Sequence, residues 1–267
     1  MKPLPQPPPL PHEHGAWVML VLPLLLGQAA AGGRSPAGWS FSAAVIAVFL
    51  AHYALVPIVE RRLAGRNAPA DWSRRRRVWG AIYFGVALAL FAATVGLAPA
   101  ANRSVITGLA TTAAVLGAVY FTAACLGAGR RAAVELVGMV AMSVSAPIVA
   151  FASGRPFSAR PLGAAVLAVV YSASALSFVR AFGAARERRG RALVACLAQH
   201  AALVAIIAWV ARDGWLPSWW WISFVPLVAR VVWGFVLPPP NLRRLGLREI
   251  WVALTYAVLA VALVVAR

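Results

Sequence analysis

Nine apolar stretches of about twenty residues, separated by short polar segments, follow one another along the chain. A helix of about twenty residues covers the hydrocarbon core of a bilayer, so each stretch predicts a membrane-spanning helix. The predicted spans are residues 15–31, 39–58, 78–97, 106–126, 132–152, 161–182, 192–211, 219–237 and 250–266. The pattern therefore predicts an all-α fold, a polytopic membrane helical bundle of about nine transmembrane helices.

The predicted spans leave room for one further region at the start of the chain. Residues 1–12 contain six prolines, which favours an extended and mobile tether. Residues 13–267 are then expected to form a single transmembrane domain.

Composition supports this assignment. The 267 residues are 62% hydrophobic and 12% charged, whereas a soluble domain is about half apolar and about a quarter charged. The net charge of +18 would indicate nucleic-acid binding in a soluble protein. Here the basic residues lie between the spans, so we expect membrane lipid as a partner and no nucleic acid.

The basic residues also predict the orientation. With the nine spans threaded through a bilayer, 17 basic residues fall on the side of the N-terminus and six on the other. Cytoplasmic loops carry the excess of Lys and Arg. The N-terminus is therefore predicted in the cytoplasm and the C-terminus outside.

Charged side chains are costly in hydrocarbon, so those retained in a span usually line a cavity and carry function. The ionisable residues inside or at the edge of the spans are His14, His52, Glu135, Arg180, His200, Arg230 and Glu249. Given the predicted orientation, nearly all lie in the cytoplasmic half. We expect them to converge on one polar cavity that opens toward the cytoplasm.

Each residue type has a chemical role in such a cavity. Glutamate and histidine exchange protons, and arginine grips phosphate or carboxylate groups without a metal. The candidate catalytic residues are Glu135, His200 and Glu249. The candidate substrate-binding residues are Glu13, His14, His52, Arg180 and Arg230.

Structural alternatives stay open for these residues. Arg180 could extend to the lipid headgroups. The role of Glu135 and Glu249 could be limited to complementing the dipoles of the helices that they begin. The two arginines and two glutamates could also form buried ion pairs that fix helix packing.

A metal site is the least supported reading. His12, His14 and His52 could supply three ligands, but no clear fourth ligand follows from the sequence. We expect no metal and no cofactor. The cysteines Cys125 and Cys196, which lie in or at the ends of spans, are expected to be packing residues.

The start of the chain resembles a known family. Glu13-His14-Gly15-Ala16-Trp17, followed by Met19 and by Leu-Pro-Leu-Leu-Leu-Gly at 22–27, is similar to the opening of the YwiC-like family of bacterial membrane proteins. The segments at 135–138 and 245–249 also look like that family. The resemblance implies a multi-pass protein of the bacterial cytoplasmic (inner) membrane and supplies no reaction.

In layout, the chain also resembles the UbiA-type intramembrane prenyltransferases. These enzymes have nine helices, and two aspartate-rich motifs in the loops after spans two and six hold a magnesium pyrophosphate. This chain has Glu60 and Asp71 among arginines after span two, and Glu187 after span six. No catalytic aspartate is carried over, and the resemblance does not extend to magnesium-dependent prenyl transfer.

Three functions fit these residues, and the sequence leaves open whether the protein is an enzyme. The first is binding or modifying an amphiphile with an anionic head of the prenyl or lipid phosphate type, which would make an amphiphilic anionic small molecule a partner. The second is a small-solute or proton-coupled transporter, and the third a structural or assembly subunit. The sequence does not indicate the oligomeric state.

Overall fold

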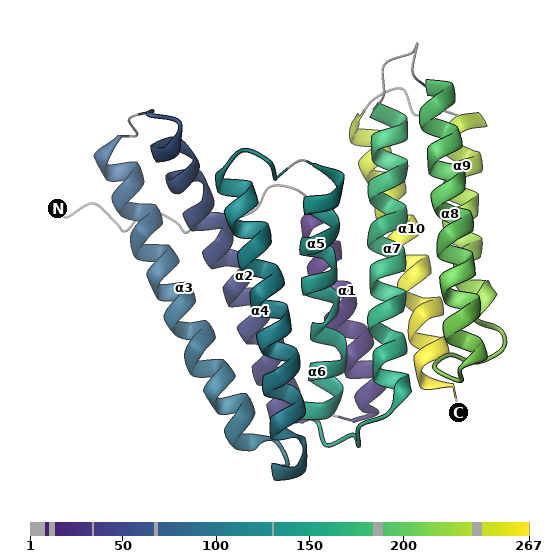
Figure 1. Ribbon diagram of the computed structural model, residues 1–267, viewed down its shortest axis with the longest axis horizontal. Helices are drawn as coiled ribbons and strands as arrows, with labels where there is room; N and C mark the ends of the chain where they lie inside the picture. Colours follow the sequence, from purple (N-terminus) through teal and green to yellow (C-terminus); the bar gives the residue numbers. More distant parts are fainter. Residues whose placement is uncertain are drawn as a thin grey trace.

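The computed structural model describes residues 9–10, 14–33, 35–66, 69–129, 131–183, 189–236 and 242–266. Every regular element within these residues is a helix, which confirms the predicted all-α fold (Figure 1). The helices are α1 (His14–Ala31), α2 (Pro36–Leu63), α3 (Ala70–Leu97), η1 (Ala100–Asn102), α4 (Arg103–Cys125), α5 (Ala132–Ser143), α6 (Ser145–Ala152), α7 (Ala159–Gly183), α8 (Arg189–Arg212), η3 (Trp220–Phe224), α9 (Val225–Val236) and α10 (Leu242–Val265). The predicted tether lies almost wholly outside the described residues.

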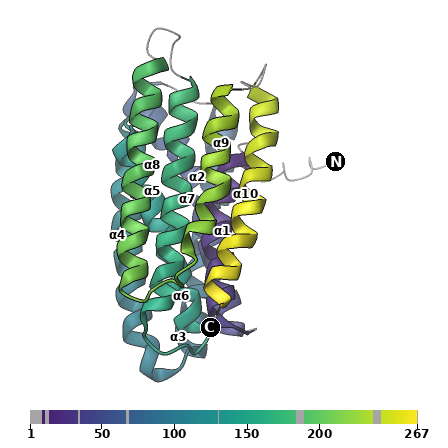
Figure 2. The same ribbon diagram turned by 90° about the vertical axis from the view of Figure 1, so that its right-hand side faces the viewer.

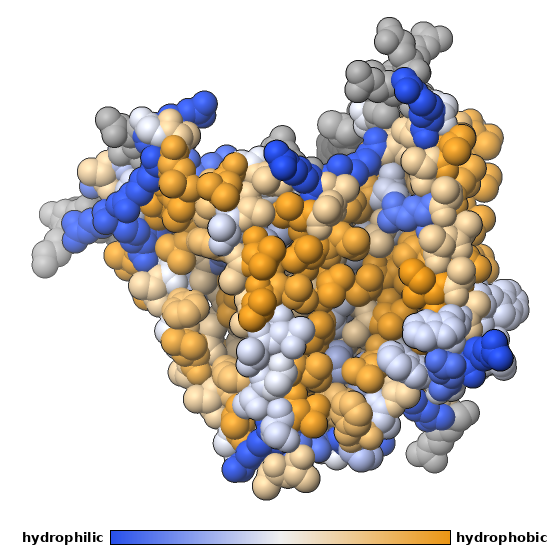
Figure 3. Space-filling model, in the orientation of Figure 1, coloured by the Kyte–Doolittle hydropathy of each residue, from blue (hydrophilic) through white to orange (hydrophobic). Residues whose placement is uncertain are grey.

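The helices have the lengths that a bilayer requires. Within the described residues, seven helical segments are long and apolar enough to cross a membrane, and two apolar segments, Ala16–Ala31 and Trp220–Val236, are shorter. These segments coincide with the nine predicted spans. On the face drawn in Figure 3, apolar residues cover most of the middle, and hydrophilic residues lie toward the two ends of the bundle. The protein is a polytopic helical membrane bundle.

Successive spans run in opposite directions. The start of α1 and the end of α10 therefore lie at opposite ends of the bundle (Figures 1 and 2). The end at which α2 finishes and α3 and α10 begin carries most arginines and is termed the arginine-rich end. The charge distribution predicts that this end faces the cytoplasm.

Helix α1 lies between the two halves of the bundle, and its leucines face both of them. Leu22 and Leu26 belong to an apolar cluster with residues of α7, α8 and α10. Leu20 and Leu24 belong to another cluster, with residues of α2, α4 and α6. Because positions i and i+4 share a face of a helix, the two pairs point in different directions and join both halves around α1.

The fifth predicted span is not one continuous helix. It divides at Val144 into α5 and α6. Ser143 and Ser145 donate their hydroxyls to the carbonyls of Met139 and Met142, and Pro147 has no N–H for the carbonyl one turn earlier. These local features interrupt the helical hydrogen bonds while the span stays apolar.

Candidate functional site

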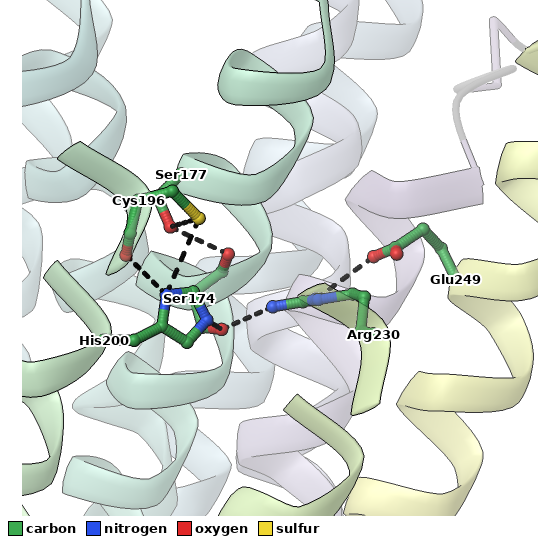
Figure 4. A network of polar contacts seen from close by, with 6 residues as sticks. All are labelled: Ser174, Ser177, Cys196, His200, Arg230 and Glu249. Carbon is green, nitrogen blue, oxygen red and sulfur yellow. Dashed lines mark hydrogen bonds and ion pairs between the residues drawn. The ribbon is translucent and has the colours of Figure 1, made fainter. Parts of the chain in front are cut away.

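Arg230 is the most buried charged side chain among those predicted to form the site. It lies in α9 with its side chain 2% exposed. Its Nη1 donates to Oε2 of Glu249 in α10 at 3.1 Å, and its Nη2 donates to the hydroxyl of Ser174 in α7 (Figure 4). Its Cζ lies 5.2 Å from the centre of the Phe178 ring. Carboxylate, hydroxyl and ring together compensate the buried charge.

His200 continues this chain of contacts into α8. Its Nε2 is 2.6 Å from the hydroxyl of Ser174, and its Nδ1 is 2.7 Å from the carbonyl oxygen of Cys196. A carbonyl oxygen only accepts, so Nδ1 carries the hydrogen and Nε2 of the neutral ring accepts from Ser174. The hydroxyl of Ser174 then accepts from Arg230 and donates to His200. One line of hydrogen bonds thus connects α10, α9, α7 and α8.

Further contacts hold α7 and α8 together beside this line. The thiol of Cys196 donates to the hydroxyl of Ser177 at 3.8 Å, and Ser177 donates to the carbonyl oxygen of Ser174 at 3.0 Å. Gln199 donates its side-chain amide to the carbonyl of Ala173 at 3.0 Å. The buried polar network is defined here by the residues drawn in Figure 4: Ser174, Ser177, Cys196, His200, Arg230 and Glu249.

Ser174, Ser177 and Cys196 were not predicted to be part of a site. A signal for them exists. Ser174 and Ser177 are three residues apart in an apolar span, and Cys196 is four residues before His200. Residues three or four apart share a helix face, so both pairs predict polar faces that could meet.

Two atoms in the buried polar network have no partner among the described residues. They are Nε of Arg230 and Oε1 of Glu249. The ion pair between these residues therefore has one hydrogen bond, where a guanidinium and a carboxylate can form two. The arrangement leaves one donor and one acceptor for a further group.

The other predicted carboxylate and arginine form a separate pair. Nη2 of Arg180 in α7 lies 2.8 Å from Oε2 of Glu135 in α5, and these side chains are 40% and 26% exposed. This pair joins two helices near the arginine-rich end. It is much more open than the pair of Arg230 and Glu249.

His52 lies in a third place, between α2 and α4. Its ring stacks on Tyr120 with the ring centres 5.2 Å apart, and it meets the edge of Phe121 at 5.8 Å. These contacts are those of a packed aromatic side chain. Among the described side chains, the predicted site residues thus lie in three places: Arg230, Glu249 and His200 are together, Arg180 is paired with Glu135, and His52 is apart from both groups.

The side chains of the site residues predicted at the start of the chain are not described. Glu13 lies outside the described residues, as does His12. Helix α1 begins at His14, whose side chain is not described. Among the side chains that are described, no group of three or more His, Cys, Asp or Glu could hold a metal ion.

The model of the YwiC-like protein family matches residues 10–150, which is more than half of the 267 residues. The chain belongs to the YwiC-like family. No curated protein and no solved structure matches the chain, and the resemblance to UbiA-type enzymes gains no support. The match ends near α6, so the buried polar network of this YwiC-like protein lies beyond the matched residues.

Two surface pockets of this YwiC-like protein lie away from the buried polar network. One, of about 550 Å³, is lined by the ends of α2 and α4 at the arginine-rich end. The other, of about 130 Å³, is at the opposite end, beside Arg160 and Trp215. Neither pocket is lined by Arg230, Glu249 or His200.

Proposed function

We propose that this membrane protein binds the anionic head of an amphiphile at Arg230, inside the bundle. The observation that carries the proposal is the incomplete ion pair between Arg230 and Glu249. Polar atoms buried in proteins almost always have hydrogen-bond partners. The partnerless Nε of Arg230 offers a donor for an oxygen of a phosphate or carboxylate group.

Charge balance implies that such binding is coupled to a proton. Arg230 and Glu249 together are neutral, so a bound anion would leave the site with one net negative charge in a medium that stabilises charge poorly. Protonation of Glu249, or of His200 through its contact with Ser174, restores neutrality. The head is therefore expected to bind more tightly at lower pH.

The surroundings of the ion pair suit an amphiphile. Glu249 is 19% exposed while Arg230 is 2% exposed, so an incoming head meets the side of α10 first. Arg248, which precedes Glu249 in α10, places its guanidinium carbon 4.6 Å from the centre of the Trp233 ring in α9. Trp233, which lies about one turn along α9 from Arg230, is 45% exposed and offers an apolar surface along which a tail can lie.

The test is to identify the molecules that copurify with the full-length protein. Mass spectrometry would compare extracts of the wild type with Arg230→Gln and Glu249→Gln. Glu249→Gln leaves a buried positive charge without a counterion, so we expect it to retain at least about tenfold more anionic amphiphile. Arg230→Gln should lose the amphiphile, and Glu249→Gln should also lose the pH dependence of binding.

Matched controls come from the more exposed ion pair. Arg180→Gln and Glu135→Gln make the same changes outside the buried polar network and should leave the extract as in the wild type. The proposal fails if only bulk phospholipid copurifies and neither Arg230→Gln nor Glu249→Gln changes it. Since the two variants are expected to act in opposite directions, a folding defect in one does not remove the test.

A second function, proton-coupled transport of a small anion, rests on the same network. Glu249 and His200 are groups that exchange protons, and Arg230 and Ser174 connect them across four helices. Proteoliposomes with an imposed pH gradient would show accumulation of a water-soluble anion if this function applies. Retention of an amphiphile without any such uptake would favour binding.

A further inference from the structure

A charged cleft lies at the arginine-rich end, on helices that do not contribute to the buried polar network. The cleft between the ends of α2 and α4 has a volume of about 550 Å³, within the range of pockets that hold small ligands. Its lining combines the charged side chains of Glu60, Arg61 and Arg66 with the apolar side chains of Leu63 and Leu126.

Positive charge is concentrated beside this cleft. The Cζ atoms of Arg61 and Arg76 lie 4.8 and 4.7 Å from the centre of one ring, that of Trp72. Arg76 also donates to the carbonyl oxygen of Tyr53 at 2.9 Å, which fixes its position. Two guanidinium groups held against one ring repel each other, and an anion nearby would lower that repulsion.

No carboxylate among the described residues forms an ion pair with Arg61 or Arg66. The ion pairs Arg180–Glu135 and Arg230–Glu249 lie on other helices. Glu60 lines the same cleft without an ion pair to either arginine. Two arginines and one glutamate give the cleft one net positive charge, which matches one phosphodiester.

Exposed apolar side chains beside the cleft indicate a lipid as the source of the phosphodiester. Leu63 and Leu126 are large apolar side chains that remain exposed at the rim. The cleft therefore presents both charge and exposed apolar surface at the arginine-rich end of the bundle, a combination that suits the level of lipid headgroups.

We propose that this cleft binds the phosphodiester of an anionic phospholipid. Arg61 and Arg66 bind the phosphate oxygens, and Leu63 and Leu126 contact the upper part of the acyl chains. Glu60 limits the cleft to a headgroup of a single negative charge. This inference goes beyond the proposed function, because a different ligand group binds to different helices.

The test is a titration of the full-length protein, in phosphatidylcholine nanodiscs, with phosphatidylglycerol. Binding is followed by native mass spectrometry and by the shift of the unfolding temperature. Arg61→Gln with Arg66→Gln should weaken binding about thirtyfold or more, because two direct bonds to a charged phosphate are lost. Glu60→Gln should strengthen binding, because a repulsive carboxylate is removed.

The control removes the same charge elsewhere on the same surface. Arg62 and Arg74 are exposed and do not line the cleft, so Arg62→Gln with Arg74→Gln should weaken binding by about threefold or less. Equal losses in the two double variants would mean that only the general basic surface attracts lipid, and would overturn the proposal.

Two other outcomes also decide the matter. If inorganic phosphate or glycerol phosphate reproduces the temperature shift at equal concentration, the ligand is a soluble phosphate and the lipid assignment is wrong. If Glu60→Gln binds phosphatidylglycerol no better than the wild type, Glu60 does not face the bound headgroup, and the proposed occupancy of the cleft is refuted.

Discussion

The ion pairs Arg230–Glu249 and Arg180–Glu135 differ in burial, and burial determines how much each contributes to the stability of the fold. Glu249→Leu leaves the guanidinium of Arg230, 2% exposed, without a counterion. Breaking a buried pair in this way costs about 3–5 kcal/mol of the free energy of unfolding. Glu135→Leu breaks a pair whose arginine is 40% exposed, so it should cost less than about 1 kcal/mol.

Double variants that replace both partners are expected to behave differently at the two ion pairs. Replacing both charged partners by apolar residues removes the unpaired charge, and such replacements are often neutral or stabilising. Glu249→Leu with Arg230→Met should therefore recover most of the stability that Glu249→Leu alone loses. Glu135→Leu with Arg180→Met should differ little from either of its single variants, because exposed partners interact weakly.

Denaturant unfolding in detergent micelles, followed by circular dichroism, measures each free energy of unfolding. The two double-mutant cycles then give the coupling energy of each pair directly. Equal losses for Glu249→Leu and Glu135→Leu would refute the argument from burial. A double variant at 230 and 249 that stays as unstable as Glu249→Leu would show that the cost does not arise from the unpaired charge of Arg230.

Three further predictions use the same unfolding assay. Ser174→Ala should lower the free energy of unfolding by about 1–3 kcal/mol, because the guanidinium of Arg230 and the imidazole of His200 each lose a hydrogen-bond partner. An unchanged stability would mean that another group replaces the hydroxyl. Gly27→Leu should lower the free energy of unfolding by about 3 kcal/mol or more, because a Cβ at Gly27 would lie 2.6 Å from the backbone oxygen of Ala146. Its control is Gly108→Ala, whose Cβ meets nothing within 4 Å, so this variant should be neutral or stabilising by up to about 1 kcal/mol. Asn102→Ala should cost about 1–3 kcal/mol, since its amide donates to the carbonyl oxygens of Phe151 in α6 and of Arg155 in the loop after it, and a smaller loss would show that water takes its place.

Hydropathy predicted where the spans lie but not where the helices end. The sequence places a loop at residues 59–77, yet α2 continues to Leu63 and α3 begins at Ala70. Arginine and alanine favour helix in water as well as in lipid, so the helices continue after the apolar stretch has ended. The interruption at Val144 was missed for the opposite reason. Pro147 lacks a backbone donor and the hydroxyls of Ser143 and Ser145 bond to helical carbonyls, but these residues lower the apolar character of the span only a little.

The predicted depth of a residue in the membrane was the strongest indication of the site, but depth does not specify the position of that residue around the bundle. It indicated that Arg230 would need compensation, and the structure supplies Glu249 as its partner. It could not exclude His52, which lies at a similar depth but packs against aromatic rings of α4. Position around the bundle depends on which helices become neighbours, and the polar pattern of single spans does not specify that. The ion-pair alternative that the sequence left open describes Arg180 and Glu135 as well.

Small residues indicate in part which helices are neighbours. Gly234 lies four residues after Arg230, on the same face of α9, and a Cβ there would lie 2.5 Å from ring atoms of Phe178. The absence of a side chain at this position lets α9 approach α7 closely. That approach brings the Phe178 ring beneath the guanidinium and puts the hydroxyl of Ser174 within its reach. A small residue one turn from a buried charge thus indicates that a neighbouring helix comes close enough to compensate it.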